Sequence, residues 1–363
     1  MCSIQIVIIV GEKMSLSFPD FITMITSNPI MLVTVLLTLG VVLVNGWTDA
    51  PNAIATCVST RCMSVRQAII MAALMNFFGV TVMTVFNATV AETIYNMVDF
   101  SGDAHNSIVA LCAAMVAIVL WATGAWYFGI PTSESHALIA GLTGAAIALQ
   151  GGLAGVNGHE WMKVIYGLVI STVMGFGLGF FIVKIINRLF KNVPLSKSAN
   201  FFQYGEIFAG AGMAFMHGAQ DGQKFIGVFL FGVFLSQGVT EATVFTIPLW
   251  VMLVISVVIT LGTSIGGYRI IKSVGMSMVK LRKHEGFASD LAGVISLLTA
   301  SIFGLPVSTT HTKTTAIMGV GASKRIRNVN WDVAKEMIWA WILTFPGCGI
   351  IGYFMAKLFM QIF

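Results

Sequence analysis

The feature that most constrains this chain is a succession of apolar runs that fills almost its whole length. An α-helix needs about 20 apolar residues to cross a bilayer, and most of these runs reach that length. Charged residues are only 10% of the 363 positions, whereas a soluble domain has about 25%. The sequence therefore predicts an all-α polytopic membrane protein without a separate soluble domain. We expect ten crossings, at residues 29–60, 64–91, 106–129, 131–150, 161–187, 204–236, 242–266, 286–305, 306–322 and 332–362.

The charges of the loops predict the orientation. Lys and Arg cluster after the first, fifth, seventh and ninth expected crossings, and they are almost absent from residues 92–105, 151–160 and 237–241. Basic loops stay on the cytoplasmic side of a membrane. The net charge of +5 therefore reflects membrane orientation, and no nucleic-acid partner is expected. We expect a multi-pass protein of the cell membrane, in contact with lipid.

The same loops divide the chain into two halves of opposite orientation. The first half starts outside and the second starts inside, so five crossings in each half make an inverted-topology repeat. The apolar N-terminus is too short for a signal peptide, and either Met1 or Met14 could be the natural start. The expected parts are an N-terminal segment (1–28), the first half (29–187), a cytoplasmic linker (188–203) and the second half (204–363).

A polar segment, residues 45–56, interrupts the first crossing at membrane depth. Asp49 is its ionisable group, and Pro51 cannot close the helical hydrogen bond at its position. A polar, broken helix inside a membrane is costly unless it lines a site. A related segment surrounds Asp221, 172 positions later. Because the first crossing of each half is also longer than 30 residues, we expect a broken helix in both halves.

A second motif, Pro-x-Ser-x-Ser/Thr-His, occurs at residues 131–136 and 306–311, 175 positions apart. Two unrelated motifs that recur in order at nearly the same spacing support the inverted repeat. Each copy opens an apolar helix, so we expect two Ser/Thr-rich helical hairpins. The helix N-terminus in each presents unpaired N–H groups that can bind a small oxyanion, although ordinary capped helices are the alternative. The candidate anion ligands are Thr132, Ser133, Ser135, Ser308, Thr309, Thr310 and Gln223.

The segments around the two aspartates carry oxygen ligands for a cation. Carboxylate, amide and hydroxyl oxygens in an unwound helix suit Na⁺, and a carboxylate alone can take a proton. A helix-packing network of hydrogen bonds is the alternative. We expect the coupling site for H⁺ or Na⁺ at Thr48, Asp49, Asn52, Gln220 and Asp221, with any Na⁺ at Asp49 and Asn52.

The two halves differ in their charged residues. The counterpart of Asn52 in the second half is Lys224, whose ammonium can take the place of a cation beside Asp221. Glu134 and Lys313 have no charged counterparts. We expect these two residues to pair with each other, or Lys313 to help hold the anion.

Three histidines adjoin the motifs. His136 and His311 follow the two Ser/Thr clusters, and His217 precedes the second aspartate. A neutral histidine that donates to a backbone carbonyl is favoured at His136 and His311. At His217 that interpretation and a proton relay both stay open.

At these motifs the chain resembles the inorganic phosphate transporter (PiT) family, from about residue 32 to 350. Residues 45–56 and 217–227 resemble the family's duplicated Gly-Ala-Asn-Asp-x-x-Asn signature, and the two serine motifs resemble its Pro-x-Ser-x-Thr-His hairpins. The resemblance implies a twelve-segment-like inverted-repeat fold and symport of phosphate with Na⁺ or H⁺. It places phosphate between the hairpins and the cations beside the signature aspartates.

The chain departs from the family's pattern at four positions. Thr48 and Gln220 replace the Asn before each Asp. Lys224 replaces the last Asn of the second signature, and Glu134 replaces the usual Ser, Thr or Asn. The Asp-Gly-Gln-Lys version resembles the family's proton-coupled, low-affinity bacterial branch, and this implies uptake of phosphate partly as a neutral metal–phosphate complex. H⁺ is therefore favoured as the coupling ion.

Two other functions stay open on the sequence alone. A sulfate permease could share the fold, but sulfate lacks the proton that Asp49, Asp221 or Glu134 could accept from phosphate. A channel or a transport-dead sensor is disfavoured by the broken helices and the pseudo-symmetry, which suit alternating access. No enzyme is expected, because no nucleophile has a base at recognisable spacing. No cofactor other than the coupling ion is expected, and a homodimer stays open.

Overall fold

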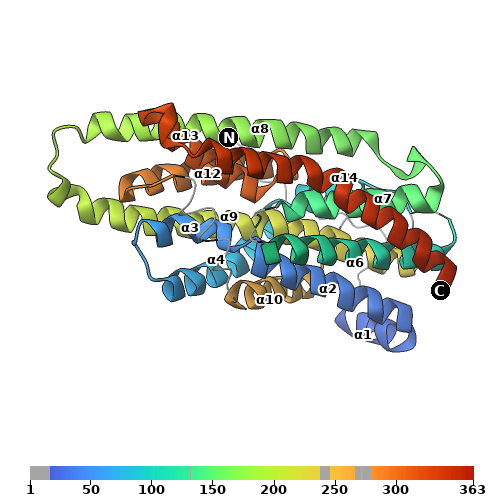
Figure 1. Cartoon of the computed structure of the whole chain (residues 1–363). Coiled ribbons are helices and arrows are strands. Elements are labelled where there is room, and N and C mark those ends of the chain that lie inside the picture. The colour runs from blue at the N-terminus through green and yellow to red at the C-terminus, as the bar shows by residue number, and fades with distance from the viewer. Residues whose placement is uncertain are drawn as a thin grey trace, which may run out of the picture.

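The computed structural model describes residues 17–100, 102–128, 130, 132–237, 246–265, 271 and 279–363. Helices make up most of this part, and the long ones run roughly along one axis of the molecule (Figure 1). The helices before residue 190 are α1 (Phe18–Ser27), α2 (Pro29–Thr48), α3 (Pro51–Ser59), α4 (Val65–Phe86), α5 (Thr89–Tyr95), α6 (Ala104–Phe128), α7 (Glu134–Gln150) and α8 (Gly158–Leu189). Those after it are α9 (Leu195–Ser236), α10 (Leu249–Ile265), α12 (Lys283–Ile302), α13 (Thr309–Lys324) and α14 (Trp331–Ile362). Short 3-10 turns, η1 (Leu153–Gly155) and η2 (Ile326–Asn328), precede α8 and α14.

Six helical stretches in the described part are long and apolar enough to cross a membrane, and each matches an expected crossing. The other four expected crossings correspond to α7, α9, α10 and α13, and residues 242–245 and 266 lie outside the described residues. With 17 and 16 residues, α7 and α13 are shorter than the roughly 20 residues of a full crossing. The count of ten therefore stays a prediction. The six stretches are Pro29–Ser59, Val65–Phe86, Ala104–Phe128, Gly158–Leu189, Lys283–Ile302 and Ala334–Ile362.

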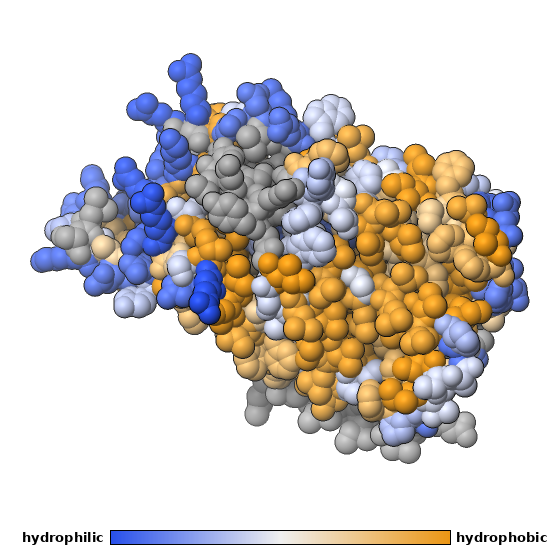
Figure 2. Space-filling model, turned by 60° about the horizontal axis from the view of Figure 1, so that its bottom comes forward, coloured by the Kyte–Doolittle hydropathy of each residue, from blue (hydrophilic) through white to orange (hydrophobic). Residues whose placement is uncertain are grey.

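The outer surface is that of a membrane protein. Figure 2 shows a broad hydrophobic band on one face, with hydrophilic residues toward opposite edges of the view. Large apolar side chains are exposed on α4, α8, α10 and α14, for example Phe78, Val173, Leu253 and Phe354. Such an extensive apolar surface needs lipid around it. By contrast, α7 and α13 are buried along almost their whole lengths.

The helix of the first crossing is broken, as the sequence predicts. α2 ends at Thr48, and the N–H groups of Asp49 and Ala50 both donate to the carbonyl of Asn45, at 2.9 and 3.3 Å. Pro51 then opens α3, where its missing N–H is tolerated because first-turn N–H groups have no helical acceptor. The break leaves Asp49 at the junction of two helices.

The break expected in the second half is wrong. α9 runs without interruption from Leu195 to Ser236, through Asp221. The physical reason is that the counterpart of Pro51 in this segment is Gln223, which keeps its backbone N–H and can continue the helix, and Gly222 beside it costs only about 1 kcal/mol inside a helix. α9 also takes in most of the expected linker, since α8 ends at Leu189 and only residues 190–194 separate the two helices.

Two short buried helices enter the bundle from opposite ends. Figure 1 shows α6 and α7 toward the right of the molecule and α12 and α13 toward the left. α7 packs on α6 and α14, and α13 packs on α12 and α8. A Cβ added at Gly144 of α7 would lie 2.0 Å from the carbonyl oxygen of Gly349, and one added at Gly319 of α13 would lie 2.1 Å from that of Phe176. These close approaches, which small residues permit, fix both helices against their neighbours.

Candidate functional site

The N-terminal ends of α7 and α13 meet inside the bundle. Ser133 caps α7 by accepting from the N–H of His136 at 3.3 Å, and Ser308 caps α13 by accepting from the N–H of His311 at 3.2 Å. The rings of His136 and His311 have centroids 4.4 Å apart. Both capping serines are fully buried. The two segments predicted to bind an anion are therefore brought together, although Pro131 lies outside the described residues.

Asp49 contacts the tip of the second hairpin. The hydroxyl of Thr310 donates to its Oδ1, and Asn52 Nδ2 donates to the same oxygen at 2.7 Å and to Thr310 Oγ1 at 2.9 Å. Asp49 Oδ2 and Asn52 Oδ1 are buried without a hydrogen-bond partner among the described residues. These two oxygens are the kind of ligand that a hard cation or a proton requires.

Asp221 is paired with Lys224, as predicted. Lys224 Nζ lies 2.6 Å from Asp221 Oδ1, and it also donates to Ser135 Oγ at 2.5 Å and to the carbonyl of Val307 at 2.6 Å. Its three N–H donors are thereby used. Asn45 Nδ2 donates to Asp221 Oδ2 at 3.2 Å. Lys224 thus joins α9 to both hairpins.

His217 lies at the same site, and one of its two ring nitrogens is hydrogen-bonded. Its Nε2 lies 3.3 Å from Asp221 Oδ2, and its Nδ1 lies 3.0 Å from Asn76 Oδ1. Asn76 Nδ2 donates to Thr263 Oγ1 at 3.1 Å, so its Oδ1 is the acceptor and Nδ1 carries the proton. One ligand atom each of Asp49, His217 and Asp221 lies within 4.8 Å of the others, a spacing that could hold a metal ion.

The expected hydrogen bond from a histidine to a backbone carbonyl is wrong at His311. Both of its ring nitrogens lack a partner among the residues that the structure describes, as does His136 Nδ1. The rings instead stack: His136 on Phe345, with centroids 4.4 Å apart, and His311 on Trp341, at 3.7 Å. The aromatic residues of α14 therefore hold these two rings in place.

The predicted pair between Glu134 and Lys313 is also wrong. Lys313 is paired with Asp290 of α12, and it donates further to Thr56 Oγ1 at 2.8 Å and to the carbonyl of Ala53 at 3.2 Å. These partners use all three donors, so Lys313 has none left for an anion. The reason is that α12 packs directly on α13 and supplies a nearer acid. Glu134 stays buried beside Asn45, and its Oε2 has no hydrogen-bond partner in the described part of the chain.

The other predicted ligands differ in what they contact. Thr48 donates to the carbonyl of Val44 inside its own helix, at 2.7 Å. Gln220 donates to Ser301 Oγ at 2.8 Å and Gln223 to the carbonyl of Asn87 at 2.6 Å. These two amides therefore tie α9 to its neighbours, and each retains a buried Oε1 without a partner among the described residues.

The hydroxyl groups predicted to bind an anion differ in what they contact. Ser133 and Ser308 accept the capping bonds with their oxygens, so capping does not use their O–H groups, whereas Thr310 donates its O–H to Asp49. Thr132 is half-buried before α7. Thr309 Oγ1 is buried, and within the described residues it has no partner. Ser135 Oγ accepts from Lys224 and makes only a long hydrogen bond, of 3.4 Å, to Asp221 Oδ1. Thr309, and Ser135 once that long bond is exchanged, can therefore donate to a ligand at the joined helix N-termini.

Two buried acids were missed by the sequence analysis, Asp290 and Glu206. Both are 0% exposed, on α12 and α9. The signal that could have found them is the cost of an ionisable group inside a membrane segment. They have no acidic counterpart at the spacing of the two repeated motifs, so the repeats do not point to them.

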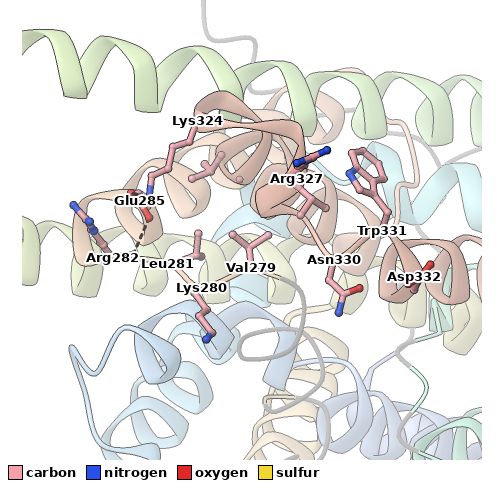
Figure 3. Close-up of a pocket in the computed structure, with 13 residues that line it drawn as sticks. Val279, Lys280, Leu281, Arg282, Glu285, Lys324, Arg327, Asn330, Trp331 and Asp332 are labelled. Carbon is pink, nitrogen blue, oxygen red and sulfur yellow. Dashed lines mark hydrogen bonds and ion pairs between the residues drawn. The ribbon is translucent and has the colours of Figure 1, made fainter.

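A large basic cavity lies away from this site, between the start of α12, the end of α13 and the start of α14 (Figure 3). Its volume is about 1150 Å³, and its lining includes Lys280, Arg282 and Arg327. Within it Glu285 is paired with Lys324 and accepts from the N–H of Arg282 at 2.9 Å. None of its described lining residues is a predicted site residue, so we treat it as a separate surface.

The sequence matches a known protein family over most of its length. The model of the phosphate transporter family matches residues 45–352. A probable low-affinity inorganic phosphate transporter of Bacillus subtilis is 39% identical over 318 residues, which are 87% of this chain and 93% of that protein. One of Rhizobium meliloti is 36% identical over 86% of this chain and 92% of its own length.

A solved structure has the same fold. It is described as the sodium-dependent phosphate transporter, and it superposes with a TM-score of 0.83 over 93% of this chain and 100% of that one. The sequence identity is 23%. At this identity the likeness shows a shared arrangement of helices and nothing more specific.

Proposed function

This chain belongs to the phosphate transporter family, and from that premise we propose that it imports inorganic phosphate by symport with a cation, H⁺ rather than Na⁺. The family match and the names of its relatives support phosphate as the substrate. Its apolar surface and six candidate spans support a place in the cell membrane. The basic loops then face the cytoplasm. They include the segments that line the cavity in Figure 3.

The observation that carries the proposal is the meeting of two helix N-termini beside two buried aspartates. Helix N-termini stabilise an anion through unpaired N–H groups and the dipole, and the ends of α7 and α13 touch through His136 and His311. We place phosphate there, in reach of Ser135 and Thr309. Asp49 then lies next to the anion, because Thr310 bonds its carboxylate. A cation or proton on Asp49 offsets the repulsion between the two negative groups.

The charges at the two aspartates favour a proton. At Asp221 the ammonium of Lys224 already supplies a positive charge at 2.6 Å. Of the two aspartates, only Asp49 then has an exchangeable charge left to bind, and its Oδ2 has no partner among the described residues. A carboxylate binds a proton with one oxygen, whereas Na⁺ needs several ligands arranged around it. The chain's Lys224 thus reduces the number of cations that the cycle requires.

We further propose that the two halves are inverted repeats that rock around this site. The contact of α7 with α14 has its counterpart in that of α13 with α8, and the contact of α4 with α9 has its counterpart in that of α10 with α2. The closest approaches agree, since Gly144 and Gly319 are 175 positions apart and each abuts a backbone carbonyl. This is the spacing of the two hairpin motifs. Such pairs of equivalent interfaces suit alternating access.

Uptake of labelled phosphate into vesicles that contain the purified protein tests the proposal. We expect an inward proton gradient to drive accumulation with no Na⁺ present, and an equal Na⁺ gradient without a pH difference to drive much less. Added Mg²⁺ should raise uptake if a neutral metal–phosphate complex is carried. Sulfate uptake under the same gradients, with none of phosphate, would contradict the assignment.

A further inference from the structure

A second cluster of buried ionisable groups lies about two helical turns beyond Asp49 along the chain. Cys57 of α3, Glu206 of α9 and Asp290 of α12 each place a ligand atom within 4.8 Å of the others. All three residues are 0% exposed, and so is Lys313 of α13. Four helices therefore converge on one small volume that water does not reach.

The charges of this cluster do not balance. Lys313 is paired with Asp290, and Thr56 donates its hydroxyl to the same carboxylate at 2.7 and 2.8 Å. This ion pair is complete in itself. Glu206 brings a second carboxylate, with no second cation among the described residues around it.

No hydrogen bond of good geometry from the described residues stabilises a negative charge on Glu206. Both of its carboxyl oxygens lack a partner in the part of the chain that the structure describes. The hydroxyls of Thr56 and Thr60 lie close enough to interact with the carboxyl, but the first donates to Asp290 and the second to the carbonyl of Thr56 at 2.8 Å. A buried carboxylate without partners is costly by several kcal/mol or more. It must be neutralised, by a proton or by a metal cation.

The surroundings favour a proton over a metal. Lys313 already occupies the place beside Asp290 that a metal ion would take. The thiol of Cys57 donates to the backbone carbonyl of Glu206 at 3.5 Å, so it carries its own proton and is not the thiolate that binds metals. The carboxyl group of Glu206 packs directly against Gly286, where a Cβ would lie only 2.4 Å from Oε1.

We propose that Glu206 is a second proton-binding site of this protein, carrying the proton as a carboxylic acid beside the Asp290–Lys313 pair. The titratable and charged groups that face it are Cys57 of α3, Asp290 of α12 and Lys313 of α13, with Cys62 after α3 further off. When the proton leaves to water, Glu206 becomes a carboxylate and the cluster gains one negative charge.

The cluster is connected to the phosphate site, and this part of the inference rests on the proposed function. On α3, Thr56 follows Asn52 by one turn, and on α13, Lys313 follows Thr310 by one turn. Thr310 bonds Asp49, and Lys313 bonds Thr56. A negative charge on Glu206 therefore disfavours both the binding of phosphate and the ionised form of Asp49. Glu206 releases its proton together with phosphate, and takes one up before the next phosphate binds.

Infrared spectroscopy of the purified protein tests the site without transport. At neutral pH the difference spectrum of wild type minus Glu206→Gln, a variant of nearly the same size, should contain the carbonyl stretch of one protonated carboxylic acid. Any band from Asp49 or Glu134 is common to both proteins and cancels. The control Glu160→Gln, which removes the partner of Lys163, should give no such band in its difference spectrum. Absence of the band from the Glu206→Gln difference spectrum would overturn the proposal, and so would stabilisation of the wild type by Na⁺ or Mg²⁺ that Glu206→Gln abolishes.

Transport measurements test the link to phosphate. Glu206→Gln should keep exchange of internal for external phosphate, which needs no net proton movement, and should carry about one proton fewer per phosphate in net uptake. An unchanged ratio would overturn the coupling role. If the wild type exchanged no phosphate, the proposed function would fail while the infrared result still decided the proton site. If Glu206→Gln did not fold, Gly286→Ala should shift the same band by crowding the carboxyl, and an unshifted band would count against the proposal.

Discussion

The ammonium of Lys224 lies 2.6 Å from the carboxylate of Asp221, and both side chains are 1% exposed. The pair occupies the position where the first half of the chain holds Asp49 and Asn52, and it reaches both hairpins through Ser135 and Val307. One half therefore carries its positive charge permanently, and the other must obtain it from outside.

Removal of the ammonium should destabilise the protein strongly. Lys224→Met leaves Asp221 buried without its cation, which costs about 3–5 kcal/mol. Adding Asp221→Asn should recover most of that loss. Unfolding of the detergent-solubilised variants measures both effects. Lys163→Met is the matched control, because its pair with Glu160 is partly exposed and should cost no more than about 1 kcal/mol.

Replacement of Asp49 should separate transport from folding. In Asp49→Asn the remaining carbonyl oxygen can still accept from Thr310 and Asn52, so we expect a stability change within about 1 kcal/mol. Proton-driven phosphate uptake should be abolished, because the exchangeable charge has lost its site. Uptake assays and unfolding curves on the same preparation check this, with the exposed Asp332→Asn as control. Proton-driven accumulation at the wild-type rate would contradict the role of Asp49.

The partner of Lys313 can be identified by double substitution. Lys313→Met should lower the free energy of unfolding by about 3–5 kcal/mol, because it leaves Asp290 buried without its cation. Combination with Asp290→Asn should restore stability, and combination with Glu134→Gln should not. The opposite pattern in unfolding experiments would mean that Glu134 is the partner after all.

The close helix contacts predict a sharp difference between glycines. Gly144→Ala and Gly319→Ala each force a methyl group against a carbonyl oxygen, which should cost about 1–3 kcal/mol. Gly177→Ala on α8 meets nothing within 4 Å, and it should be neutral or stabilising by up to about 1 kcal/mol. Thermal unfolding measures the three side by side, and equal effects at Gly144 and Gly177 would contradict the packing.

What the sequence could predict was local or repeated. Pro51 identifies the break after Asp49, because proline acts on its own helix. The Asp221–Lys224 pair was predictable because the residues are three apart on one helix face. The serine motifs identified the two helix starts because capping is also local.

What escaped prediction depends on which helices become neighbours. Lys313 pairs with Asp290 because α12 packs on α13, and no sequence spacing indicates that a third helix brings Glu206 to the same place. The uninterrupted course of α9 was missed because the repeat suggested a symmetry of shape. Only the first copy has the proline that breaks a helix.

The central claim is that phosphate is held where α7 and α13 meet, next to Asp49. Diffraction from crystals grown with arsenate, which has the shape and charge of phosphate, locates the anion by the anomalous signal of arsenic. We predict a peak between the two helix N-termini, in contact with Ser135 and Thr309. A peak found only in the basic cavity of Figure 3 would contradict the account. So would the absence of a peak between the two helices, provided that arsenate is shown to compete with phosphate for uptake.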